Sequence, residues 1–130
     1  MVEEVKCLIK KKKQLESESS ELQRQLKDSR FKHCDEKDAR IHHINEQLTL
    51  ISILLNILSE DQLFVIQRHL IDEIDWPRVK LEYDKKWGVD YGKSIRTLMS
   101  YQKKGLEKQY NFLLSQGKQA EDEYRKILSC

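Results

Sequence analysis

The chain has 130 residues, of which 35% are charged and 38% are hydrophobic, and it contains four glycines and one proline. A β-sandwich or barrel needs turn residues roughly every 8–12 positions, so this composition excludes those folds and predicts an all-α protein. The formal net charge of +2 indicates neither an acidic nor a basic partner. Neither GxGxxG nor GxxxxGK[ST] occurs, which excludes the glycine-rich loops that cradle phosphates.

The first predicted element is an N-terminal helical segment with two heptad patterns. Over residues 5–33, leucine occupies three d positions but the a positions are half polar, which is typical of a weak coiled coil. Over residues 41–58, every a and d position is aliphatic. We therefore expect residues 1–58 to form a coiled-coil arm that makes the protein a homodimer through Leu8, Leu15, Leu22, Leu26, Ile41, Ile44, Leu48, Ile51, Leu55 and Leu58.

The two heptad frames differ by one residue, and the slip falls at residues 31–38. One continuous helix of about 57 residues, about 85 Å long, accommodates the slip by a local change of winding. Alternatively, the chain breaks near residues 29–35 and restarts with Asp35 or Asp38 as N-cap, which gives a helical hairpin. Because no glycine or proline marks a turn there, we favour the continuous helix.

Residues 59–116 follow as a second domain of three helices. The S-x-x-Q spacing from Ser59 to Gln62 is a capping box, so a helix begins there, and its apolar stripe is Leu63, Val65, Ile66 and Leu70. After a connector at 71–75, Asp75 is the expected N-cap of a second helix. That helix runs to about Trp87, has Pro77 in its first turn and buries Val79, Trp87 and either Leu81 or Tyr83. Gly88 suits the left-handed position after a helix end.

Ser94 is the expected N-cap of the third helix, which extends from Ile95 to about Ser115. Gly105 lies inside this helix, where only close packing explains a glycine. Its buried face is expected to contain Ile95, Leu98, Met99 and Leu106. Gly117 ends the helix and leaves a C-terminal tail, residues 117–130, with a short helix at 120–128.

Basic charge is concentrated on the third helix. Between Lys93 and Lys108 there are five bases and one acid, a local charge of +4, so the remainder carries +2 − 4 = −2. The side chains left to point outward suit phosphates and base edges, and arginine is the most frequent base reader. We expect contacts with double-stranded DNA from Lys93, Ser94, Arg96, Thr97, Ser100, Tyr101, Lys103 and Lys104. An ordinary solvated helix is the alternative interpretation.

Several short segments occur in a recognisable order, namely Phe64-Val-Ile66, Trp76-Pro-Arg-Val79, Lys93-Ser-Ile-Arg-Thr-Leu98 and Gln102-Lys-Lys-Gly-Leu106. Over about residues 58–114 the chain resembles the sigma-factor region-four helix-turn-helix of phage transcriptional regulators of the ArpU and RinA type. The resemblance implies that Ser94, Arg96 and Thr97 contact DNA and that Trp76 and Val79 pack inside the domain. It also implies activation of phage genes through the host RNA polymerase. Residues 84–92 are longer than the usual tight turn of that family.

Other signals in the sequence predict little chemistry. His33, Cys34, His42 and His43 form two adjacent pairs whose members point about 100° apart on a helix, so we interpret them as solvated surface and expect no metal site. Cys7, Cys34 and Cys130 lack CxxC spacing and predict reduced thiols. No catalytic motif occurs, so we expect neither an enzyme nor a cofactor or small-molecule substrate. The lysine run at 10–13 either contacts DNA or keeps a weak coiled coil soluble, and we favour the second, solvated interpretation.

The apolar run at 48–58 is too short to span a membrane, and the N-terminus does not have the pattern of a signal peptide, so we expect a cytoplasmic protein. The leading hypothesis is a sequence-specific double-stranded DNA-binding transcriptional regulator that dimerises through its N-terminal helices. The alternative is a helical interaction module, a coiled-coil adaptor or inhibitor that docks a partner protein without binding DNA.

Overall fold

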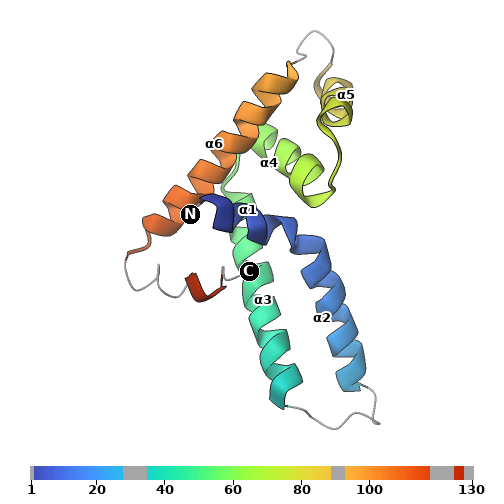
Figure 1. The fold of residues 1–130 in the computed structure, drawn as a ribbon, viewed down its shortest axis with the longest axis vertical. Helices are drawn as coiled ribbons and strands as arrows, with labels where there is room; N and C mark the ends of the chain where they lie inside the picture. Colours follow the sequence, from blue (N-terminus) through green and yellow to red (C-terminus); the bar gives the residue numbers. More distant parts are fainter. Residues whose placement is uncertain (1, 28–34, 89–92, 118–124, 128–130) are drawn as a thin grey trace.

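A computed structural model describes residues 2–27, 35–88, 93–117 and 125–127 of the chain. Over these ranges the structure is helical and contains no strand, which confirms the predicted all-α class. Its elements are α1 (Val2–Lys10), α2 (Lys12–Lys27), α3 (Asp35–Asn56), α4 (Glu60–Ile66), the π-helix η1 (Gln67–Ile71), α5 (Trp76–Trp87) and α6 (Ile95–Leu114). Figure 1 shows α2 and α3 projecting from a group formed by α1, α4, α5 and α6.

The helices α2 and α3 lie side by side and run in opposite directions (Figure 1). Ser19 of α2 donates from Oγ to Asn45 Oδ1 of α3 at 3.5 Å, and Arg40 donates to the Glu18 carboxylate at 2.9 and 3.1 Å. The preference for one continuous helix over residues 2–58 is therefore wrong, and the hairpin alternative is the observed fold. A hairpin covers the aliphatic stripe of α3 within the same chain, whereas a straight helix needs a second chain to keep that stripe out of water.

The residues predicted to form a dimer seam pack within one chain. Fully or almost fully buried are Leu8, Leu15, Ile44, Ile51 and Leu55. Another three, Leu22, Leu48 and Leu58, are partly buried against the same core, and Ile41 is half-buried. The side chain of Leu26 lies outside the described part. A dimer formed by this stripe requires the hairpin to open or to be exchanged between chains.

The main hydrophobic core crosses the boundary predicted at residue 58. It contains Val5 of α1, Leu54 of α3, Leu70 of η1 and Leu106 of α6, together with the α2–α3 residues named above. A break at Lys11 turns α1 away from the direction of α2, so that α1 packs against both α6 and η1. The C-terminal half of α6 thus belongs to the same core as the hairpin.

A second core lies between α4, α5 and the N-terminal half of α6. It consists of Phe64, Val65, Val79, Tyr83 and Leu98, with Ile74, Trp76, Trp87 and Tyr101 packed around it. This core corrects one sequence expectation and decides between two alternatives. Leu63 is exposed because its neighbour Phe64 occupies the inward position. Of the two candidates on α5, Tyr83 is buried and Leu81 is 55% exposed.

The predicted helix starts are confirmed at the described caps. Ser59 and Gln62 form both hydrogen bonds of the capping box, at 3.1 and 3.3 Å, and α4 follows. Asp75 precedes α5 with extended backbone but without a side-chain cap bond. Gly88 ends α5 at φ +93° and Gly117 follows α6 at φ +92°, conformations that favour glycine. Residues 89–92 lie outside the described ranges, and of the predicted helix at 120–128 only residues 125–127 are described, as helix.

Candidate nucleic-acid interface

The helix α6 is held by an unusually close approach to α4. A Cβ atom at Gly105 would lie 2.8 Å from Ile66 Cδ1, and Ile66 is fully buried. The glycine therefore brings the backbone of α6 next to the side chains of α4, as its place in the sequence predicted. The helix α6 also contacts α1 and α5, and its side opposite Gly105 is left free, since positions 96, 99, 103, 107 and 114 there are exposed.

The basic residues predicted to contact DNA lie on that free side. Lys93, Arg96, Lys103 and Lys104 are exposed, and none of them forms an ion pair with the residues that the structure describes. Positions 96, 100, 103 and 107 recur at helical spacing, so Arg96, Ser100, Lys103 and the acidic Glu107 share one face of α6. The interface is thus a predominantly basic face, to which α6 contributes Arg96, Lys103 and Lys104 and the residue before its N-cap contributes Lys93, with Glu107 as an acid among them.

The uncharged residues among the predicted DNA contacts take part in capping and packing, unlike the basic ones. Ser94 Oγ accepts a hydrogen bond from Thr97 N at 3.2 Å and lies 3.0 Å from Thr97 Oγ1, which makes this pair the N-cap of α6. Ser100 is half-buried, and Tyr101 packs against the second core. Met99, expected on the buried face, is instead 44% exposed; the buried residues of α6 are Leu98, Gly105, Leu106, Gln109 and Leu113.

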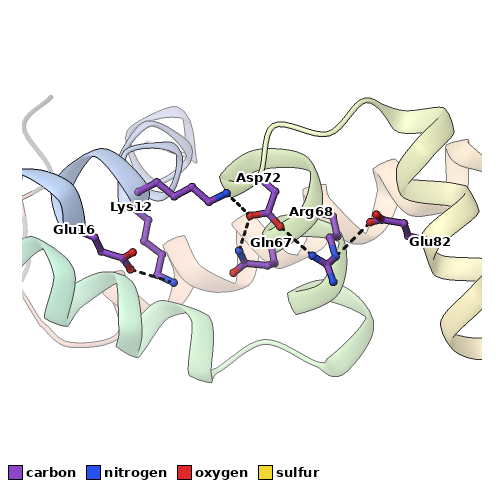
Figure 2. Close-up of polar contacts among 7 residues, drawn as sticks. Lys12, Glu16, Gln67, Arg68, Asp72 and Glu82 are labelled. Atoms are coloured by element: carbon purple, nitrogen blue, oxygen red, sulfur yellow. Dashed lines mark hydrogen bonds and ion pairs between the residues drawn. The ribbon is translucent and has the colours of Figure 1, made fainter.

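A polar network fixes α5 and η1 against the N-terminal arm, as Figure 2 shows. Lys13 Nζ lies 2.7 Å from Asp72 Oδ1, Gln67 Nε2 donates to the same oxygen at 3.2 Å, and Arg68 donates to Oδ2 at 3.2 Å. Arg68 Nε also lies 3.4 Å from Glu82 of α5. Burial opposes ionisation of Asp72, but the bonds from Lys13, Gln67 and Arg68 outweigh it and lower its pKa.

The π-helix η1 places His69 between α5, α6 and α1. The ring of His69 is stacked on Trp76 with centroids 3.9 Å apart, and its Nδ1 lies 2.6 Å from Gln102 Oε1. Burial lowers the pKa of His69; the Gln102 hydrogen bond acts in the opposite direction, whereas the charges of Lys6 and Lys10 lower the pKa further. Sequence reasoning noted His69 only as an interruption of an apolar stripe, because nothing local signals a π-turn.

Candidate metal and membrane features add no second site. No group of three or more His, Cys, Asp or Glu side chains in the described residues is arranged to hold a metal ion, and His42 pairs with Glu46 at 2.7 Å. His33 and Cys34 lie outside the described ranges.

Among the helices described, none combines the length and apolarity that a bilayer crossing requires. Cys7 is disulfide-bonded, so the expectation of reduced thiols is wrong for this residue; the other two cysteines lie outside the described part.

Comparison with known proteins finds no relative of this chain: no family model matches it, and neither the curated proteins nor the solved structures contain a significant match.

Proposed function

We propose that this protein is a sequence-specific double-stranded DNA-binding transcriptional regulator in which α6 enters the major groove. The observation that carries the proposal is the row of exposed, unpaired cations on α6, because phosphate contacts supply most of the affinity of proteins for duplex DNA. Arg96 is the proposed base reader, and Lys93, Lys103 and Lys104 are the proposed phosphate contacts.

The way in which α6 packs against its neighbours supports the same function. A recognition helix must present its outer face at a fixed angle, and α6 is fixed at its N-terminal half by the second core and at Gly105 by α4. The helices α4, α5 and α6 follow in the order that the resemblance to ArpU- and RinA-type phage regulators implies. In this proposal the N-cap pair of Ser94 and Thr97 holds the start of α6 and offers Thr97 to the DNA.

Binding to duplex DNA as a function of salt tests the proposal. A duplex about 30 base pairs long, selected by the wild-type protein from a random-sequence pool, is titrated by fluorescence anisotropy. We expect log K to fall linearly with log salt, with a slope of about −0.9 per neutralised phosphate. Arg96→Ala should lower the preference for the selected duplex by about 1–3 kcal/mol, whereas Lys104→Ala should weaken binding to all duplexes and reduce the slope by about one.

The matched control is Lys27→Ala, because Lys27 is an exposed lysine at the far end of α2, away from α6 (Figure 1). Its affinity and salt slope should equal those of the wild type. Equal affinities and slopes for wild type, Arg96→Ala and Lys104→Ala contradict the assignment of α6 as the recognition helix.

A second candidate function is docking of a partner protein, and a groove on the outer side of α3 favours it. The groove has a volume of about 410 Å³, and Ile53, one of the exposed large apolar residues, lies in it. It is lined by His42, Asn45, Glu46, Thr49, Leu50, Ile53 and Ile127. Failure of the wild-type protein to bind any duplex at low salt is the result that favours this function over DNA binding.

A further inference from the structure

Four of the lysines at the start of the chain, Lys6, Lys10, Lys12 and Lys13, differ in their partners. Lys12 lies 3.5 Å from Glu16, and Lys13 lies 2.7 Å from Asp72, so both are held by acids. Lys6 and Lys10 form no ion pair with the residues that the structure describes. The two stand at i and i+4 on α1, where like charges repel each other and destabilise the helix. Neither lysine therefore gains stability from an ion pair within the described residues.

The packing of α1 points these two lysines toward the candidate interface. Val5, Leu8 and Ile9 face the main core, so Lys6 and Lys10 lie together on one flank of α1. The helix α1 contacts η1, which carries His69, and the charges of both lysines lower the pKa of His69. His69 in turn contacts Gln102 of α6, the residue before Lys103.

A second basic surface therefore lies beside the first. The helix α1, which carries the two lysines, contacts both α6 and η1, and Figure 1 shows α1 beside α6. His69 and Gln102 connect η1 to α6 at this place, and neither side chain carries a negative charge. A polyanion that lies on Lys103 of α6 can extend over these two side chains to reach α1.

We propose that Lys6 and Lys10 of α1 form a second phosphate-binding patch, which contacts the sugar–phosphate backbone of duplex DNA beside the groove that α6 enters. The inference rests on the proposed function and adds to it a role for the arm: the α1 segment is part of the DNA footprint. Because the contacts are to phosphates, they raise affinity for all sequences equally and do not change base preference.

Salt-dependent anisotropy with a random-sequence duplex of about 30 base pairs tests the patch. Loss of two phosphate contacts in Lys6→Gln with Lys10→Gln should make the slope of log K against log salt shallower by about 1.8, since each contact contributes about 0.9. The ratio of affinities for selected and random duplexes should stay unchanged. Lys6→Arg with Lys10→Arg keeps both charges and should restore the wild-type slope.

The matched control removes the same charge elsewhere. Arg24→Gln with Lys27→Gln takes two positive charges from the far end of α2, and it should keep the wild-type slope. If the Lys6 and Lys10 pair of substitutions unfolds the protein, as judged by its thermal melt, Lys10→Gln alone is used. Lys10 is exposed, and its loss should change the slope by about half as much.

The outcomes separate the patch from the function on which it rests. A wild-type slope in the Lys6→Gln, Lys10→Gln variant, together with weaker binding by Lys104→Ala, overturns the patch and leaves α6 as the interface. An equal change in the α2 control also overturns it, because the effect is then one of net charge alone. A wild-type protein that does not bind duplex DNA at low salt overturns both.

Discussion

At the scale of single residues, Gly105 decides how closely α4 and α6 approach each other. Three side-chain atoms lie within 3.4 Å of the place where its Cβ would be, from Ile66, Gln62 and Leu58. Glycine inside a helix is unfavourable by about 1 kcal/mol relative to alanine. The position therefore keeps its glycine for packing and not for helix formation.

Gly105→Ala should lower the free energy of unfolding by about 1 kcal/mol, because an overpacking cost of about 1–3 kcal/mol exceeds the gain in helix propensity. Urea denaturation measures the change. Ile66→Val removes the Cδ1 atom that the new methyl group meets, so it should be less destabilising in the Gly105→Ala background than in the wild type. A Gly105→Ala protein that is more stable than the wild type contradicts the close approach.

His69 is a second residue whose environment has a measurable effect, in this case on the pH dependence of stability. Its pKa is lowered below 6.5 in the folded chain, so the unfolded chain binds the proton more readily. The resulting stabilisation is fully present above about pH 6.5 and is lost as the pH falls below that value.

The melting temperature of the wild type should therefore decrease between about pH 7 and about pH 5.5, and His69→Gln should reduce this decrease. A His43→Gln variant, altered on α3 away from the cluster of His69, Trp76 and Gln102, should keep the wild-type decrease. Thermal melts followed by circular dichroism at several pH values give the comparison. Identical pH profiles for wild type and His69→Gln would refute the role of His69.

At the scale of elements, the sequence predicts what neighbouring residues determine. The capping box at Ser59, the N-cap at Ser94 and the left-handed end at Gly88 are formed by a few residues each, and all three are confirmed. The π-helix η1, in which the Asp72 N–H donates to the Gln67 carbonyl, was not foreseen, because no local sequence pattern signals it; η1 packs against the distant α1 and against α5. Phe64 takes the inward position in place of Leu63 because it packs against Tyr83 and Trp87 of α5, which the local pattern does not reveal.

Pairing between distant segments was the harder part of the candidate site to predict. The exposed cations on α6 follow from the charge pattern of residues 93–108. Their neighbours on α1 do not, since nothing in the sequence says that residues 2–10 fold back onto α6. The burial of Gln109, which donates from Nε2 to the Leu54 carbonyl at 2.9 Å, likewise depends on how α6 meets the end of α3.

At the scale of the whole molecule, the hairpin predicts that residues paired between α2 and α3 belong to the same chain. Glu18 and Arg40 hydrogen-bond across it, although 22 residues separate them; on one continuous helix they would be about 33 Å apart. In an Arg40→Lys variant, a carbodiimide should join the introduced amine to the Glu18 carboxylate, and the joined peptides are identified by mass spectrometry.

An equal mixture of isotope-labelled and unlabelled chains shows whether this link forms within one chain. We expect both linked peptides to carry the same label, because the hairpin closes on itself. The native pair of Lys13 and Asp72 supplies an internal control for the reagent. Links between labelled and unlabelled peptides in about half of the product would instead indicate two chains that exchange their hairpins, the form in which the heptad residues build a dimer.

The helix α6 contributes residues to both hydrophobic cores and therefore connects them physically. Its 20 residues form one rod of about 30 Å, whose lower half is fastened to the hairpin through Leu106, Leu113 and Gln109. Because the second core and α4 hold the N-terminal half of the same helix, α6 joins the two cores mechanically. A displacement of α3 or α1 that changes the direction of Arg96 therefore has to displace the second core as well.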